Sequence, residues 1–268
     1  MKAIVKSREE KGLWLEPQPW AILSGVATAE QARALLDVTD EQLRRGSPIG
    51  AMQMNRSPDS LAATVVETGT SVNGGVWPSL NATLIWALTR VDPAMAWDEW
   101  KKNSFAVHTE VYPEIWYNTW SGGDTLNSTL SKTPGQTVNS GFLHYTDFPV
   151  MNLHSHACSL YSAAKLMGIE FSRSGLEVAP ALSEEDYRLE SPLVGVRRTK
   201  AGFEGWYAPS TAGAWTVVVR LPRAESQRIT KAEVNGRQHE FERAADGSIE
   251  VRGSSVPGKP LSWAIWWR

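Results

Sequence analysis

The chain has 268 residues, of which 42% are apolar and 21% are charged, and its formal net charge is −2. These values are typical of a globular protein with one large or two medium domains. The near-neutral charge excludes a general electrostatic attraction to nucleic acid or to an anionic membrane, so neither is expected as a partner. The single cysteine, Cys158, excludes an internal disulfide framework.

The N-terminal residues include no apolar stretch of the kind found in a secretion signal, and no run reaches the length of a membrane span. We therefore expect a cytoplasmic protein. Tryptophan is unusually frequent, with 13 in the chain. Most large aromatic rings belong to a core, but Trp77, Trp116 and Trp120 fall in predicted loops, where they could stack on a ligand.

Helical patterns dominate the first part of the chain, after a predicted hairpin over residues 3–15. Thr28-Ala-Glu-Gln31 has the pattern of a capping box, and the helix that it opens should end before Gly46. The apolar side of this helix should carry Ala32, Leu35, Leu36 and Leu43.

Three further helices follow. The first runs from about Ser79 to Val91, and Asp92-Pro93 then opens the next, because Asp is a good N-cap and Pro is tolerated in the first turn. The last runs from about Met151 to Met167 and should end at Gly168. Its apolar stripe is predicted to be Ala157, Leu160, Tyr161 and Ala164.

Short strands separated by tight turns replace the helical pattern near residue 175. Strands are expected at 215–221, 231–234, 249–252 and 261–267, with turns at Asn235-Gly236 and Asp246-Gly247. The predicted fold is α+β, with a helical domain over residues 1–175 and an antiparallel β-sandwich over 176–268. A linker is expected over Val178–Pro192.

Residues Thr109–Ser128 mix carboxylates with aromatic rings, as carbohydrate sites do, because rings stack on sugar faces while carboxylates bind hydroxyls or move protons. Glu110, Glu114 and Asp124 are the candidate catalytic residues. Each could instead be a solvated or loop-stabilising carboxylate.

The candidate sugar-binding residues are aromatic rings, amides and one histidine, and each has an ordinary structural alternative as a core ring or a loop residue. They are Trp77, Trp116, Trp120, Tyr117, Asn73, Asn127 and His108. His154 and Cys158 have a spacing that a metal could use, but zinc needs three or four converging ligands, so no metal is expected. No nucleotide or dinucleotide fingerprint is present, and no cofactor is expected.

Three segments together resemble the cellobiose and chitobiose phosphorylases of glycoside hydrolase family 94. They are Leu15-Glu-Pro-Gln-Pro-Trp with the residues up to Arg33, Asn73-Gly-Gly-Val-Trp77, and Asp147-Phe-Pro-Val-Met with the residues up to Ile169. The resemblance implies the C-terminal part of an (α/α)6 barrel, followed by a trailing β-sandwich.

The family's general acid would lie upstream of Gln18-Pro-Trp, outside this chain. Its phosphate ligands are not matched, since Val76, Trp77, Pro78 and Ser79 stand where the family has a histidine. Water is therefore the expected nucleophile, and the chain alone would lack the acid.

Two functions follow from these observations. The chain is either the C-terminal portion of an enzyme that hydrolyses a glucan or oligosaccharide, or a non-catalytic carbohydrate-binding or accessory module. A fragment of a barrel would expose an apolar edge, so its expected partner is the missing N-terminal portion or a second copy. A third option is an interaction module with Trp263, Trp266 and Trp267 at a sticky edge.

Overall fold

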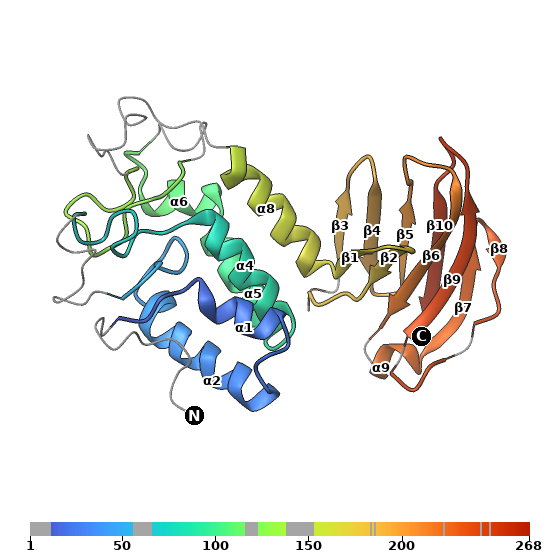
Figure 1. The fold of residues 1–268 in the computed structure, drawn as a ribbon. Helices are drawn as coiled ribbons and strands as arrows, with labels where there is room; N and C mark the ends of the chain where they lie inside the picture. Colours follow the sequence, from blue (N-terminus) through green and yellow to red (C-terminus); the bar gives the residue numbers. More distant parts are fainter. Residues whose placement is uncertain are drawn as a thin grey trace. The chain divides into compact units, whose positions relative to one another are not determined.

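The computed structural model describes residues 12–55, 66–115, 123–137, 153–182, 184, 186–221, 223–241, 243–246 and 248–268. It divides the chain into two compact units, Met1–Ala163 and Ala164–Arg268 (Figure 1). The described part of the first unit is helical and the second contains two sheets, which confirms the predicted α+β fold with a β-sandwich. That the helices are part of an (α/α)6 barrel stays a prediction.

The helices of the first unit begin at the residues that their capping signals indicate. The Thr28 hydroxyl accepts the Gln31 N–H at 3.2 Å and the Gln31 side chain accepts the Thr28 N–H at 3.0 Å, so the capping box is confirmed. The Asp92 carboxylate likewise accepts the Met95 N–H. The helices are α1 (Pro17–Leu23), α2 (Ala29–Thr39) with the π-helical turn η1 (Asp40–Arg44), α4 (Pro78–Thr89), α5 (Pro93–Lys102), α6 (Phe105–Val111) and α8 (Leu153–Leu166).

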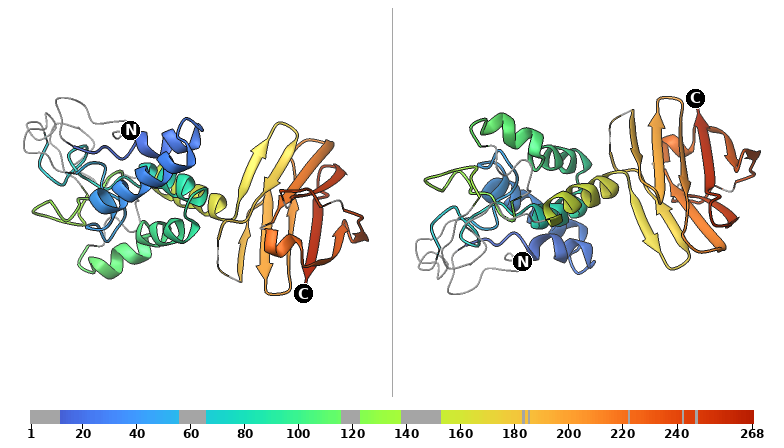
Figure 2. Two further views of the ribbon diagram at one scale, coloured as in Figure 1. Left: turned by 90° about the horizontal axis from the view of Figure 1, so that it is seen from below. Right: turned by 90° about the horizontal axis from the view of Figure 1, so that it is seen from above.

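Helix α4 is the packing centre of this unit. Its side chains Leu84, Ile85 and Leu88 are completely buried, and the helix contacts both α1 and α5. In both views of Figure 2 the blue and teal helices remain neighbours. On α5, Trp97 and Trp100 stack with their ring centroids 5.2 Å apart and their planes 12° from parallel.

The predicted apolar stripe of α8 is wrong. Leu160 is 69% exposed and Tyr161 is 44% exposed, whereas Ser162, Ala163 and Leu166 are buried. Tyr161 instead packs edge-on against Trp86 of α4. The spacing of apolar residues indicated a helix correctly, but it does not determine which side the helix buries.

Two sheets face each other in the second unit. A four-stranded sheet has the order β1-β2-β6-β9, with β2 and β6 parallel and the other pairs antiparallel. A six-stranded antiparallel sheet has the order β3-β4-β5-β10-β7-β8. The bounds are β1 (Ile169–Ser172), β2 (Gly175–Val178), β3 (Tyr187–Glu190), β4 (Val194–Thr199), β5 (Gly202–Tyr207), β6 (Gly213–Arg220), β7 (Ile229–Val234), β8 (Arg237–Gln238), β9 (Ser248–Ser255) and β10 (Leu261–Trp267), with the short helix α9 (Arg223–Ser226) after β6.

The Asn235-Gly236 turn joins β7 to β8 as predicted, and both residues have positive φ, as a type I′ hairpin turn requires. Strand β3 occupies part of the segment expected to be a linker. The sticky edge is also wrong, because β10 is an interior strand between β5 and β7, and Trp263 and Trp267 are buried. The domain boundary at residue 175 stays a prediction.

No helix in the described part of the chain is long and apolar enough to cross a membrane.

Candidate functional site

The loops of the first unit meet in a layer of short β-bridges, which we call the loop layer (residues 66–77 and 123–137). Val76 and Leu126 exchange both backbone hydrogen bonds, at 2.8 and 2.9 Å, and the Gln53 N–H donates to the Gly75 carbonyl. Val76 and Leu126 of the layer form a small apolar core with Ile49 and Met52, against which Tyr112 packs. These loops therefore have a fixed backbone on which side chains can be positioned.

Asn73 holds a turn of this layer together. Its N–H donates to the Thr70 carbonyl, its carbonyl accepts the Gly69 N–H, and its side-chain amide donates to the Val66 carbonyl at 2.9 Å. Asn73 is 1% exposed, and its side-chain oxygen has no partner among the described residues. The predicted sugar ligand is thus a buried loop residue.

Two other predicted ligands, His108 and Asn127, meet at Gly135. His108 Nε2 lies 2.7 Å from the Gly135 carbonyl, and the Asn127 carbonyl accepts the Gly135 N–H at 2.8 Å. The Asn127 amide also donates to Thr133. Both side chains are almost completely buried, and burial lowers the pKa of His108 below its ordinary value of 6.5. A neutral imidazole that donates from Nε2 keeps this loop closed.

The Val76–Leu126 bridge brings together the two segments that carry Trp77 and Asp124. In an antiparallel pair the chain that follows Val76 runs beside the chain that precedes Leu126, so Trp77 lies opposite Thr125, and Asp124 is the residue before Thr125. Both Trp77 and Asp124 are half-buried, so part of each side chain reaches solvent. The indole N–H of Trp77 donates to the Ser71 carbonyl at 3.1 Å, which anchors one edge of the ring.

The remaining predicted carboxylates lie elsewhere. Glu110 is exposed on α6, two residues from the buried His108 and therefore on the other side of the helix, and Glu114 is exposed after the end of α6. Trp116, Tyr117 and Trp120 lie outside the described residues.

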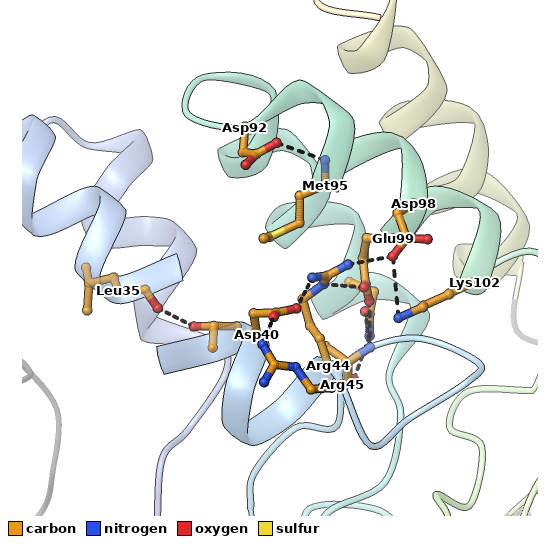
Figure 3. Close-up of polar contacts among 12 residues, drawn as sticks. Leu35, Asp40, Arg44, Arg45, Asp92, Met95, Asp98, Glu99 and Lys102 are labelled. Atoms are coloured by element: carbon orange, nitrogen blue, oxygen red, sulfur yellow. Dashed lines mark hydrogen bonds and ion pairs between the residues drawn. The ribbon is translucent and has the colours of Figure 1, made fainter. Parts of the chain in front are cut away.

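A buried ion cluster around Arg44 was not predicted from the sequence (Figure 3). Arg44 is 3% exposed and pairs with Asp40, with Asp98 at 2.9 Å and with Glu99 at 2.6 Å. The other Glu99 oxygen accepts the Ala51 N–H at 2.6 Å. Because Glu99 is completely buried and both of its oxygens are engaged, we assign it a structural role.

Two signals in the sequence could have located this cluster. Glu99 lies three residues after the buried Ala96 on α5, and Arg44 lies eight residues after the buried Leu36, on the same helical stripe. A charge at an apolar helical position is unusual unless it is paired. Among the described residues, no group of three or more His, Cys, Asp or Glu side chains could hold a metal ion.

Comparison with known proteins corrects the expected family. No family model matches the chain, and no curated protein matches it. Similar solved structures include a GH127 β-L-arabinofuranosidase from Geobacillus stearothermophilus T6 (13% identity, TM-score 0.32, covering 94% of this chain and 40% of that one). Another is described as a glycoside hydrolase (12% identity, TM-score 0.31, covering 83% and 39%).

These neighbours are not family 94 phosphorylases, so the predicted relationship to the cellobiose and chitobiose phosphorylases is wrong. The chain spans about two fifths of the length of each of the two structures. The short motifs at Gln18-Pro-Trp and Asn73-Gly-Gly are explained by local needs, a helix start and a tight turn. Gly75, for example, leaves no room for a side chain, since a Cβ there would lie 2.7 Å from the Ser71 backbone.

Proposed function

We propose that the chain is a carbohydrate-active protein whose sugar site is the part of the loop layer around Trp77 and Asp124. The observation that carries this proposal is the Val76–Leu126 bridge, which brings the segment with an anchored, half-buried indole alongside the segment with a half-buried carboxylate. An indole face can stack on the apolar side of a sugar ring while the carboxylate accepts hydrogen bonds from its hydroxyls. The rigid loop layer supplies the fixed geometry that such recognition requires.

Hydrolysis is the reaction that this pair could take part in. Asp124 would protonate the leaving oxygen or activate water, and a second carboxylate is needed at roughly 5–9.5 Å for either stereochemical outcome. Of the predicted carboxylates, Glu110 and Glu114 are both exposed, whereas a catalytic acid or base is normally held in a partly buried site, which does not favour either as that second group.

This placement favours a second candidate function, sugar binding without turnover. A site with one carboxylate and one stacking ring can hold a saccharide, whereas glycoside cleavage normally uses two carboxylates.

The test is hydrolysis and binding of a panel of aryl glycosides and neutral oligosaccharides by the whole chain and by three variants. If the chain is a hydrolase, Asp124→Asn should reduce turnover about a hundredfold or more while binding persists, because a positioned acid or base contributes about 10²–10⁴. Trp77→Ala should weaken binding, and Glu110→Gln is the matched carboxylate control and should change neither.

If the chain binds a sugar without hydrolysing it, and Trp77→Ala weakens that binding, the binding module is favoured. Turnover that is unchanged in Asp124→Asn would remove Asp124 from the mechanism. Absence of both binding and turnover would refute the proposed site.

A further inference from the structure

A groove lies on the outer face of the six-stranded sheet, the face opposite the sandwich core. Its volume is about 510 Å³, and its lining includes Gly195, Arg197, Glu204, Trp206, Ala264 and Trp266. The alternation of β10 shows which face this is, since Trp263, Ile265 and Trp267 are buried while Ser262, Ala264 and Trp266 are only half-buried. A volume in this range fits a bound small molecule or part of a chain.

Small residues create the hollow. Gly195 on β4 and Ala264 on β10 stand on either side of β5 at positions that face outward, where a larger side chain would fill the groove. The indole of Trp206 covers Gly195 on the adjacent strand, because a Cβ on Gly195 would lie 2.4 Å from the Trp206 Nε1 atom. The ring thus lies close against the sheet and helps form the floor.

A second indole stands at the other end. On β10, Trp266 lies opposite Gly202 of β5, and Ser262 lies opposite Trp206 of β5. Because Ser262 and Trp266 are four residues apart, the two tryptophans are offset by four residues along the strand direction. That offset between the two backbone positions is about 14 Å at about 3.4 Å per residue. The Lys231 ammonium lies 4.8 Å from the Trp266 ring centroid and braces that ring from β7.

The charged side chains between and beside the two rings form pairs of opposite charge. Arg197 pairs with Glu204 at 3.5 Å, Lys231 with Glu233 at 2.5 Å, and Arg188 with Glu190 at 2.5 Å. Three cations therefore face three carboxylates, and the face has no net charge to attract a polyanion such as nucleic acid. It offers instead many fixed donors and acceptors for neutral hydroxyl groups.

From these features we infer that the groove is a binding site for a neutral oligosaccharide of more than one sugar unit. The indoles of Trp206 and Trp266 stack on sugar rings at the two ends, and the Arg197–Glu204 pair binds hydroxyls between them. A single sugar cannot contact rings carried by two strand positions about 14 Å apart, so affinity rises with chain length. The site is separate from Trp77 and Asp124 and does not depend on the function proposed for them.

The experiment is calorimetric titration of the whole chain with cellohexaose, xylohexaose and linear arabinohexaose, with glucose and polygalacturonate as comparators. At least one neutral hexasaccharide should bind, and glucose should bind much more weakly. Trp206→Ala and Trp266→Ala should each lower affinity about tenfold, because a stacked ring contributes about 1–1.5 kcal/mol.

Trp206→Phe keeps a ring over Gly195 and should retain most of the affinity, which separates loss of stacking from loss of folding. Trp215→Ala is the matched control, since Trp215 is a half-buried tryptophan on β6 of the other sheet, and it should bind as the unaltered chain does.

Three results would overturn the inference. The first is that no neutral hexasaccharide binds. The second is that binding survives in the Trp206→Ala/Trp266→Ala double variant but is lost in Trp77→Ala, which would leave the proposed function intact and remove the groove. The third is that polygalacturonate binds best and is released by salt, which would indicate an anion site.

Discussion

Arg44 illustrates how this chain handles a buried charge. Its guanidinium pairs with three carboxylates from two elements, η1 and α5. The Glu99 carboxylate also accepts a hydrogen bond from the backbone N–H of Ala51. The Asn81 side chain bonds both the N–H and the carbonyl of Ala51. The segment before the loop layer is therefore held by polar contacts that an apolar core could not supply.

Arg44→Met should lower the free energy of unfolding of the first unit by about 3–5 kcal/mol, because it leaves Glu99 buried without its cation. Arg33→Met is the matched control. Arg33 is 52% exposed in its pair with Asp92, and its loss should cost less than about 1 kcal/mol. Urea unfolding measures both changes, and equal losses would contradict a special role for burial.

His108 should make stability fall in acid. Burial lowers the pKa of the folded state below 6.5, so the unfolded chain takes up the proton first as the pH falls. The stability that His108 contributes is thus present above pH 6.5 and is lost as the pH falls from there through the folded-state pKa. The slope in that window is at most about 1.4 kcal/mol per pH unit.

His108→Gln keeps a donor for the Gly135 carbonyl but does not titrate. Urea unfolding free energies of both proteins, measured from pH 8 to pH 4 (roughly the range in which His titrates), should diverge below pH 6.5. Curves that stay parallel would show that His108 protonates equally easily in the folded protein.

At individual residues, sequence reasoning found polar and aromatic positions that matter but could not assign what they do. Asn73, Asn127 and His108 were predicted as sugar ligands, and their amides and imidazole bond the loops; their contact with a sugar stays a prediction. The same donors serve either purpose, so residue type cannot decide between them. Trp206 was missed because its significance depends on Gly195 across the sheet, a neighbour that only strand register reveals.

At the level of elements, local signals predicted starts, turns and ends well. The Thr28 capping box, the Asp92 cap and the Asn235-Gly236 hairpin each depend on residues within four positions, so they can be recognised in the sequence. The buried side of α8 and the order of the strands depend on distant partners, so they could not. Gly168, which follows the end of α8, is another local signal that can be recognised in the sequence.

Gly168→Ala should destabilise the second unit much more than Gly25→Ala destabilises the first. Both glycines have φ +74, so both substitutions carry the same backbone strain of about 1 kcal/mol. At Gly25 a Cβ meets nothing within 4 Å, whereas at Gly168 it would lie 1.8 Å from the Ala179 carbonyl oxygen. Thermal unfolding should show an additional loss of at least about 2–3 kcal/mol for Gly168→Ala. Equal losses of stability in the two variants would mean that the backbone at Ala179 moves aside without cost.

At the scale of the whole molecule, the two units have separate cores. Leu84 and Ile85 are completely buried in the first, and Val217 and Ile249 are completely buried in the second. Residues in one core gain nothing from burial in the other, so each unit can unfold as its own cooperative step.

We therefore expect two unfolding transitions by calorimetry. Leu84→Ala should shift one of them and Ile249→Ala the other, each by a cavity cost of about 2–5 kcal/mol. If either variant moved both transitions together, the units would be a single cooperative structure.

The stacked pair Trp97 and Trp100 offers an optical probe of helix α5. Two indoles so close together couple their electronic transitions, and where the two transition directions are not parallel the coupled bands appear in circular dichroism as adjacent lobes of opposite sign. Trp20 and Trp86, with ring centroids 6.3 Å apart, form a second such pair, so a Trp97→Phe variant isolates the contribution of α5. Both rings are held in place, Trp97 beneath the Lys101 ammonium and Trp100 by the Ser159 carbonyl. Because α5 also carries Glu99, the partner of Arg44, this signal reports on the state of the buried ion cluster without any added label.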